Sequence, residues 1–353
     1  MIDLTRFKRM ILRAASISIT VIGLTHLQAC AMGQYPSSAE SEVKFHFGLM
    51  DFTPDNQMLI FEYVLPNGAE KVGFYFLGSK ERFPVDLPSN RYWSEPAVSP
   101  DGRYLALTSA CVVSCLKEDM GAQIALIDLS NSEPNFKLMT TGPGYKSGPV
   151  FTNNGKHIVY AFGPDNGRSH RGLARVNFDG EEEVLQRFDD WGIVRAVRHA
   201  FFDSHGNYYA AIYSADSAIR KPLKKYRSAI SFPVLYKFRR GDYKVLDVVE
   251  FAKETFISSP SISKDDEIVF LGFSEEGADR FRTDIYASKD NVVRKILPMN
   301  ARNSFMKSSR DGSVMAIISA EDFYSQKDIY IYRPSSGLEK TGISDEIIAD
   351  LQP

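Results

Sequence analysis

A turn motif that recurs six times constrains the fold of this 353-residue chain more than any other feature. The clearest copy is VSPDGRYLAL at Val98–Leu107, where a tight turn separates two apolar runs. Each copy has one reference turn residue: Asn56, Gly102, Gly155, Gly206, Asp266 and Gly312. These positions are 46, 53, 51, 60 and 46 residues apart. Similarity at such a period indicates a repeat architecture in which each copy is one structural unit.

Each copy has the residues of a β-hairpin. Gly and Asn tolerate the positive φ that a tight turn requires. Three positions before the turn residue, all six copies have Ser, Thr or Asp: Thr53, Ser99, Thr152, Asp203, Ser263 and Ser309. Three positions after it, every copy has a large apolar residue: Leu59, Leu105, Ile158, Tyr209, Val269 and Met315. The alternating apolar run that follows is typical of a strand.

A second pair of strands follows each hairpin. The expected pairs in the second, fifth and sixth copies are 123–129 with 136–140, 283–287 with 292–297, and 328–333 with 338–342. Four strands in roughly 50 residues make one propeller blade, and blades bury both of their faces only in a ring. The sequence therefore predicts an all-β, six-bladed β-propeller of four-stranded antiparallel blades over residues 43–343. We expect the first blade to close the ring by packing on the last, and a short helix in the tail, 344–353.

The first 42 residues predict export and anchoring. Four basic residues precede an apolar stretch of 11 residues at Ala14–Leu24, whereas a membrane span needs about 20. The sequence LQAC at 27–30 resembles the lipobox of bacterial lipoproteins, which implies a signal peptide at 1–29, a lipid on Cys30 and a flexible tether at 30–42. Ala31 favours the outer membrane over the inner one. The alternative is an ordinary signal peptide cut near Ala29 or Ala31.

The two remaining cysteines, Cys111 and Cys115, lie in the segment CVVSC. An exported chain meets oxidising conditions, which favour a disulfide. A straight strand would hold their Cα atoms about 13 Å apart, too far to bridge. A disulfide therefore requires this segment to form a loop. No further ligands for a metal lie nearby in the sequence, so we expect neither a metal nor a cofactor.

The unit SEPAVSPDGRYLALTSA, with a later DIY strand at 284–286 and 328–330, resembles the WD-like repeat of TolB-type propellers. Similar repeats occur in the propellers of prolyl-oligopeptidase-type enzymes. The resemblance implies a periplasmic interaction scaffold. It does not imply the partners of TolB, because TolB has a separate α/β domain before its propeller and is soluble, whereas a short lipid-anchored tether is expected here.

The sequence contains no motif of a known catalytic site. It has no Gly-x-Ser-x-Gly elbow, His-Glu-x-x-His, P-loop or dinucleotide fingerprint. The net charge of −2 argues against a nucleic-acid partner. We therefore expect a monomer that binds protein without catalysis. The alternative is a propeller-type polysaccharide lyase or hydrolase with a central metal near His199 and Arg198, because His199 and His46 fall on inner strands.

The binding residues are expected on one face. In a propeller, the loops that join blades share a face with the loops between second and third strands, whereas the reference turns lie opposite. Basic residues of the third and fourth blades gather on the first face, together with one aromatic residue: Arg168, Arg171, Arg195, Arg198, His199, Lys221, Lys224, Lys225, Tyr226 and Arg227. The loops of blades five and six are acidic. This basic sector predicts binding of an acidic envelope-protein segment or an anionic glycan; the alternative is a set of solvated loops.

Overall fold

The computed structural model describes residues 45–85, 87–112, 121–130, 136–164, 169–189, 191, 193–214, 234–249, 258–263, 265–273, 282–290, 292–320 and 326–351. Four antiparallel sheets of four strands follow one another along the chain. The first two comprise β1 (His46–Phe52), β2 (Met58–Val64), β3 (Glu70–Phe76) and β4 (Glu81–Pro84), then β5 (Arg91–Val98), β6 (Tyr104–Cys111), β7 (Ala122–Asp128) and β8 (Phe136–Leu138). The next two comprise β9 (Tyr145–Phe151), β10 (His157–Gly163), β11 (Gly172–Asn177) and β12 (Glu182–Arg187), then β13 (Val194–Phe202), β14 (Tyr208–Ser214), β15 (Val234–Phe238) and β16 (Val245–Val248).

The last two repeats form one sheet of seven strands. Its strands are β17 (Ser258–Ile262), β18 (Ile268–Phe273), β19 (Thr283–Lys289), β20 (Val292–Ser308), β21 (Met315–Ala320), β22 (Asp328–Arg333) and β23 (Gly337–Lys340). The fold is thus an all-β propeller with four-stranded antiparallel blades. The prediction of six separate blades is wrong, because four blades are separate and the fifth and sixth repeats share a strand.

The shared strand is β20, which is 17 residues long. Its first part pairs with β19 and its second part with β21. The joining segment stays extended because β19 holds it: the Met299 N–H donates to Asp284 Oδ1 at 2.9 Å, and Asn303 Nδ2 donates to the Thr283 carbonyl at 2.8 Å. The chain therefore passes from the outer edge of one repeat to the inner strand of the next without a loop.

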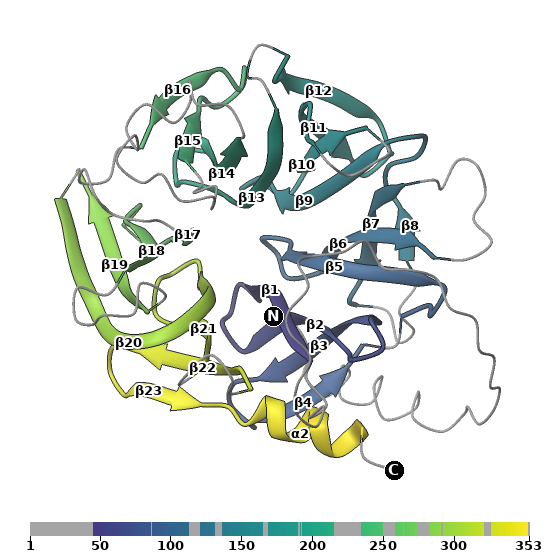
Figure 1. The fold of residues 1–353 in the computed structure, drawn as a ribbon. Helices are drawn as coiled ribbons and strands as arrows, with labels where there is room; N and C mark the ends of the chain where they lie inside the picture. The colour runs from purple at the N-terminus through teal and green to yellow at the C-terminus, as the bar shows by residue number, and fades with distance from the viewer. Residues whose placement is uncertain are drawn as a thin grey trace.

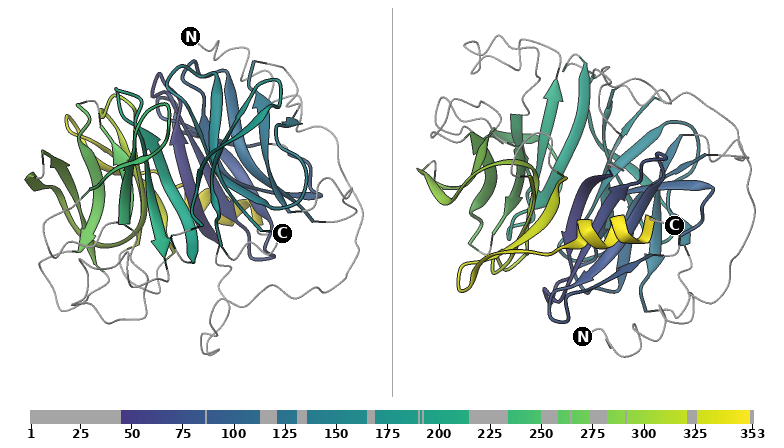
Figure 2. Two further views of the ribbon diagram at one scale, coloured as in Figure 1. Left: turned by 90° about the horizontal axis from the view of Figure 1, so that it is seen from above. Right: turned by 60° about the horizontal axis from the view of Figure 1, so that its bottom comes forward.

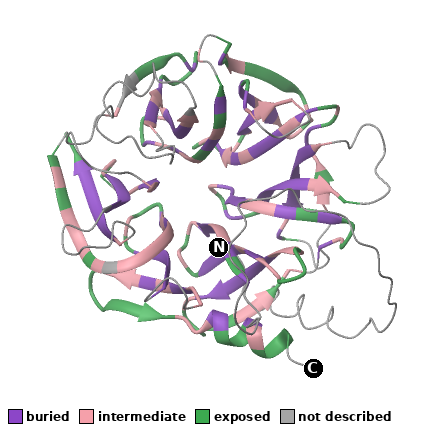
Figure 3. Cartoon of the chain, viewed as in Figure 1, coloured by how far each residue is buried: buried purple, intermediate pink, exposed green. Residues whose placement is uncertain are grey.

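The sheets stand in a ring around a central axis, with β1, β5, β9, β13 and β17 innermost (Figure 1). The ring closes by packing, as expected, since Phe45, Phe47 and Leu59 of the first repeat share a core with Ala316 and Ile318 of β21. The terminal helix α2 (Ile343–Leu351) crosses the outside of this junction (Figure 2). Exposed residues concentrate on turns and on outer strands such as β12 and β23 (Figure 3).

The six reference turns adopt the conformation that the sequence predicts. The turn residues have φ of 55°, 75°, 68°, 82°, 54° and 69° for Asn56, Gly102, Gly155, Gly206, Asp266 and Gly312. The hydroxyl three positions earlier closes several of these turns, as where Ser99 Oγ accepts the Tyr104 N–H at 2.8 Å. The turns therefore lie at one end of every repeat, and the loops that join repeats lie at the other end. We call these two ends the turn face and the loop face.

No helix in the described ranges is both long enough and apolar enough to cross a membrane.

Candidate functional site

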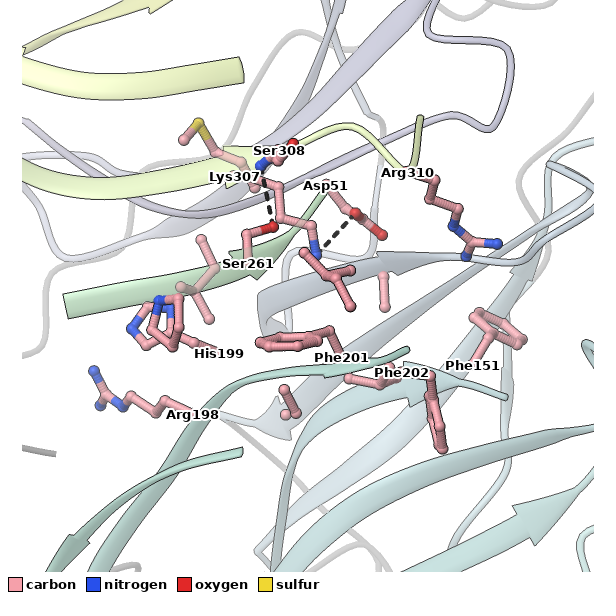
Figure 4. Close-up of a pocket in the computed structure, with 18 of the residues that line it drawn as sticks. Asp51, Phe151, Arg198, His199, Phe201, Phe202, Ser261, Lys307, Ser308 and Arg310 are labelled. Atoms are coloured by element: carbon pink, nitrogen blue, oxygen red, sulfur yellow. Dashed lines mark hydrogen bonds and ion pairs between the residues drawn. The ribbon is translucent and has the colours of Figure 1, made fainter. Parts of the chain in front are cut away.

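A cavity of about 270 Å³ lies on the axis of the ring and is lined by the inner strands of all six repeats. Figure 4 shows aromatic side chains and ionic groups side by side in it. The aromatic lining residues include Phe151, Phe201, Phe202, Phe305 and Tyr208. Near them, Lys307 Nζ lies 3.2 Å from Asp51 Oδ1. The cavity therefore offers apolar surface together with an ion pair that is already satisfied.

The inner strands bulge at one common depth. In the second to fifth repeats, the residue seven positions before the reference turn residue has positive φ: 56° at Glu95, 63° at Gly148, 51° at His199 and 49° at Ser259. The pairing register shifts beside each of these residues. A bulge re-aims the side chain at its apex, and three of these residues, Glu95, Gly148 and His199, line the cavity.

His199 is a neutral group in this cavity. Its ring centroid lies 5.7 Å from that of Phe305. Burial lowers the pKa of His199 to about 3, with smaller contributions from the charges of Arg198 and Lys307. His199 therefore adds no positive charge to the predicted basic sector, because its charged form is desolvated and lies near two cations. His46, its expected companion near the axis, is exposed at the start of β1 and does not line the cavity.

An acidic group lies between the first and second repeats, toward the loop face. Glu62 Oε2 accepts the N–H of Glu95 at 3.0 Å and that of Leu49 at 3.4 Å. Glu95 Oε2 in turn accepts the Gly148 N–H at 2.6 Å. Burial raises the pKa of Glu62 to about 7, with a smaller contribution from the carboxylates Glu95 and Glu70 and against the lowering effect of the two N–H donors. Burial and Glu95 also raise the pKa of Glu70. We call Glu62, Glu70 and Glu95 the acidic group.

A basic group lies where the third repeat passes into the fourth. The His170 N–H donates to the Val194 carbonyl at 2.7 Å, so the loop before β11 lies against the start of β13. The end of β12 pairs with the start of β11. These contacts bring four exposed arginines to one corner of the loop face, and we call them the basic group: Arg171, Arg187, Arg195 and Arg198. The structure thus brings together three of the predicted arginines and adds Arg187.

The remaining predicted residues cannot be placed. Cys30, Cys115, Arg168, Lys221, Lys224, Lys225, Tyr226 and Arg227 lie outside the described residues, as do the acidic loops of the fifth and sixth repeats. Cys111, at the end of β6, is disulfide-bonded. Its pairing with Cys115 stays a prediction.

One pair of side chains has the contact of a nucleophile and its base. Ser147 Oγ lies 3.0 Å from His170 Nε2. Both residues are buried, with 3% and 7% of their surfaces exposed, and neither lines the axial cavity. Burial also lowers the pKa of His170. The pair therefore joins β9 to the adjoining loop as a structural contact. The described residues also contain no group of three or more His, Cys, Asp or Glu that could hold a metal ion.

Sequence reasoning missed the acidic group and the ion pair between Asp51 and Lys307. One sequence feature could have identified part of it. Glu95 and His199 both lie seven residues before a reference turn residue, and both are at bulges of inner strands. Glu62 and Glu70 carry no such mark, because they reach the group from β2 and β3 by packing between repeats.

The fold agrees with comparisons to known proteins. No protein-family model matches the chain. A curated relative, the "Tol-Pal system protein TolB" of Hydrogenovibrio crunogenus (strain DSM 25203 / XCL-2), is 34% identical over 107 residues, which are 29% of this chain and 22% of the relative. The chain thus spans less than a quarter of that relative's length.

Solved structures resemble nearly the whole ring. An oligogalacturonate lyase in complex with manganese has a TM-score of 0.52 at 15% identity, covering 82% of this chain and 75% of the lyase. The tricorn protease also has a TM-score of 0.52, at 18% identity, covering 83% of this chain and 26% of the protease. These likenesses support the propeller fold, and the sequence match adds its TolB-like character.

Proposed function

We propose that this protein is a periplasmic binding scaffold, held at the bacterial outer membrane by a lipid on Cys30, which binds envelope protein with its loop face and has no catalysis of its own. The observation that carries the proposal is the separation of charge across that face. The acidic group lies by the first and second repeats and the basic group by the third and fourth. Complementary charge steers and orients a protein partner.

Two further observations favour a scaffold. The TolB-like sequence match comes from a protein named as part of the Tol-Pal system, which is consistent with envelope protein partners. The cavity is also poorly suited to the alternative of a lyase with a metal at His199. Arg198 and Lys307 lie close enough to lower the pKa of His199, and these two cations would oppose a metal cation there. The likeness to a lyase at 15% identity concerns the fold.

Site-directed photocrosslinking in the cells of origin tests the scaffold. A photoreactive amino acid would replace Ile193 on the loop face, which is 60% exposed. The control would replace exposed Lys156 in a reference turn on the opposite face. We expect one defined envelope protein to crosslink from position 193 and not from position 156. Absence of that product, or equal products from both positions, would contradict the proposal.

Fractionation tests the anchor separately. A Cys30→Ser variant removes the only thiol at the expected lipobox, so the protein should leave the membrane fraction. The Cys111→Ser variant is the control and should stay with the membrane. Membrane association of Cys30→Ser would show that the lipid is not the anchor.

A further inference from the structure

Most arginines in the described part of the chain have a partner, and those of the basic group do not. Ion pairs hold Arg82, Arg103, Arg175, Arg239, Arg294 and Arg333. Among the described residues, no ion pair or side-chain hydrogen bond is made by Arg171, Arg187, Arg195, Arg198 or Arg240. Four of these five form the basic group. Unpaired guanidinium groups are thus concentrated at one corner of the loop face.

The surroundings of this corner indicate a protein ligand. Each guanidinium offers a planar fork of donors that matches a carboxylate in two-point contact. Exposed Ile193 lies two residues before Arg195, and the phenylalanine-lined cavity begins at Arg198. Apolar surface beside unpaired arginines suits a chain that carries both carboxylates and apolar side chains. A polyuronate offers carboxylates without apolar side chains.

The acidic group helps to orient the bound segment on the loop face. The carboxyl oxygens of Glu62 and Glu95 already accept backbone N–H groups, and they offer no donor to another carboxylate. An acidic segment is therefore repelled from the first and second repeats and attracted to the third and fourth. Opposite charges at two places on one face orient the bound segment.

We infer that the basic group captures an acidic segment of the partner protein, with Arg171, Arg187, Arg195 and Arg198 binding its carboxylates and Ile193 contacting an adjacent apolar side chain. This inference rests on the proposed scaffold function and names the chemistry of its partner.

Fluorescence anisotropy with defined peptides tests the inference. The probe is a labelled peptide of three Glu-Leu-Asp-Gly units, and its neutral counterpart has three Gln-Leu-Asn-Gly units. We expect the full-length protein to bind the acidic peptide at least about tenfold more tightly than the neutral one, with affinity falling as salt is raised. Equal binding of the two peptides would overturn the inference.

Paired variants locate the binding. Arg195→Glu with Arg198→Glu should weaken binding of the acidic peptide by about tenfold or more. The control pair, Lys156→Glu with Arg240→Glu, makes the same change in net charge at exposed positions away from the basic group. It should weaken binding of the acidic peptide by less than about twofold. Equal losses would overturn the inference. A third pair, Arg195→Gln with Arg198→Gln, removes charge without reversal and should still weaken binding; thermal unfolding of each variant checks its fold.

Two further arms separate other outcomes. Preferential binding of polygalacturonate or of phosphatidylglycerol vesicles, with the same sensitivity to Arg195→Glu and Arg198→Glu, would overturn the inference in favour of a glycan or a lipid. The crosslink from position 193 should also disappear when both arginines are reversed. A crosslink that persists would support the scaffold function and contradict capture of an acidic segment. If no crosslink forms even in the unaltered protein, the scaffold function itself is contradicted.

Discussion

Glu62 is a buried carboxyl group whose ionisation is coupled to the fold. Its carboxylate joins β1 and β5 through the N–H groups of Leu49 and Glu95. Gly48 makes room for it, because a Cβ at that position would lie 2.4 Å from the Glu62 carboxyl carbon. The site thus requires an acceptor at Glu62 but stabilises its protonated form.

Stability should therefore fall as the pH rises through the titration of Glu62. The folded pKa, about 7, lies above the ordinary value of 4.5. Between these values the folded state holds a proton that the unfolded state has lost. The free energy of unfolding therefore falls by up to about 3 kcal/mol from pH 4.5 to pH 7 and by little more above pH 7. Glu62→Gln keeps an acceptor without the charge. In urea unfolding it should match the unaltered protein near pH 5 and exceed it at pH 8.

The control is Asp189→Asn, at an exposed carboxylate. It should leave the pH profile of the unfolding free energy unchanged. Parallel profiles for Glu62→Gln and the unaltered protein between pH 5 and pH 8 would contradict the role assigned to Glu62.

The turn residues should be sensitive to a single methyl group. Gly102 has φ of 75°, which an L-residue with a Cβ adopts at a cost of about 1–2 kcal/mol. Gly102→Ala should therefore lower the free energy of unfolding by that amount. Gly78→Ala is the matched control, since Gly78 lacks a left-handed φ and its added Cβ would meet nothing nearer than 4.0 Å. Equal effects of the two substitutions in urea titrations would argue against strain at the turn.

Among the elements, α2 holds the first and last repeats together from outside. Ile343 and Ile347 are 0% and 2% exposed in the core that both repeats share. Arg82 of β4 forms ion pairs with Glu346 and Asp350 on the helix. The helix therefore contacts both sides of the junction where the ring closes.

Truncation of one side chain tests this helix. Ile347→Ala should cost about 2–4 kcal/mol, because it leaves a cavity in a closed core. Leu351→Ala, at a residue 38% exposed in the last position of the helix, should cost less than about 0.5 kcal/mol. Guanidinium unfolding monitored by tryptophan fluorescence gives both values. A cost below 1 kcal/mol for Ile347→Ala would show that α2 contributes little to closure.

The strands and turns could be predicted because their signals are local. A residue that tolerates positive φ, followed by alternating apolar residues, specifies a hairpin wherever it occurs. The merging of two repeats in β20 could not be predicted in this way. It depends on Asp284 and Asn303, whose hydrogen bonds keep the passing chain on β19. The repeat pattern predicts the hairpin of each unit, but it does not predict the hydrogen bonds that join one unit to the next.

The two halves of the site differ in the same respect. Arg171, Arg195 and Arg198 could be predicted because loop topology alone assigns them to one face. Glu62, Glu70 and Glu95 come from three strands of two repeats, and their approach depends on how closely those repeats pack. Of these three residues, Glu95 has a recognisable sequence position, seven residues before the reference turn residue Gly102.

At the scale of the whole molecule, Asp51 of the first repeat contacts both the last repeat and the second. Lys307 of the last repeat lies 3.2 Å from Asp51 Oδ1, and the Val98 N–H of the second repeat donates to Asp51 Oδ2 at 2.7 Å. One buried carboxylate therefore joins three repeats around the axis.

Removal of this carboxylate should loosen the closure of the ring. Asp51→Ala should cost about 2–4 kcal/mol, because it leaves a partly buried lysine and a buried N–H without their acceptor. In a double-mutant cycle, Lys307→Met should recover about 1 kcal/mol or more of that loss. Hydrogen exchange should rise in β1 and in the second half of β20 and stay unchanged in β10 and β11. Additive effects of the two substitutions would show that the pair is not coupled.

The long strand β20 also bears on how such a ring can be inherited. The boundaries between the first five repeats fall outside the strands, where a duplication or deletion can cut without dividing one. The boundary between the fifth and sixth repeats falls inside β20, so a cut there would divide a strand that pairs with β19 on one side and β21 on the other. We therefore expect descendants of this ring to gain or lose units among the earlier repeats and to transmit the last two as a pair.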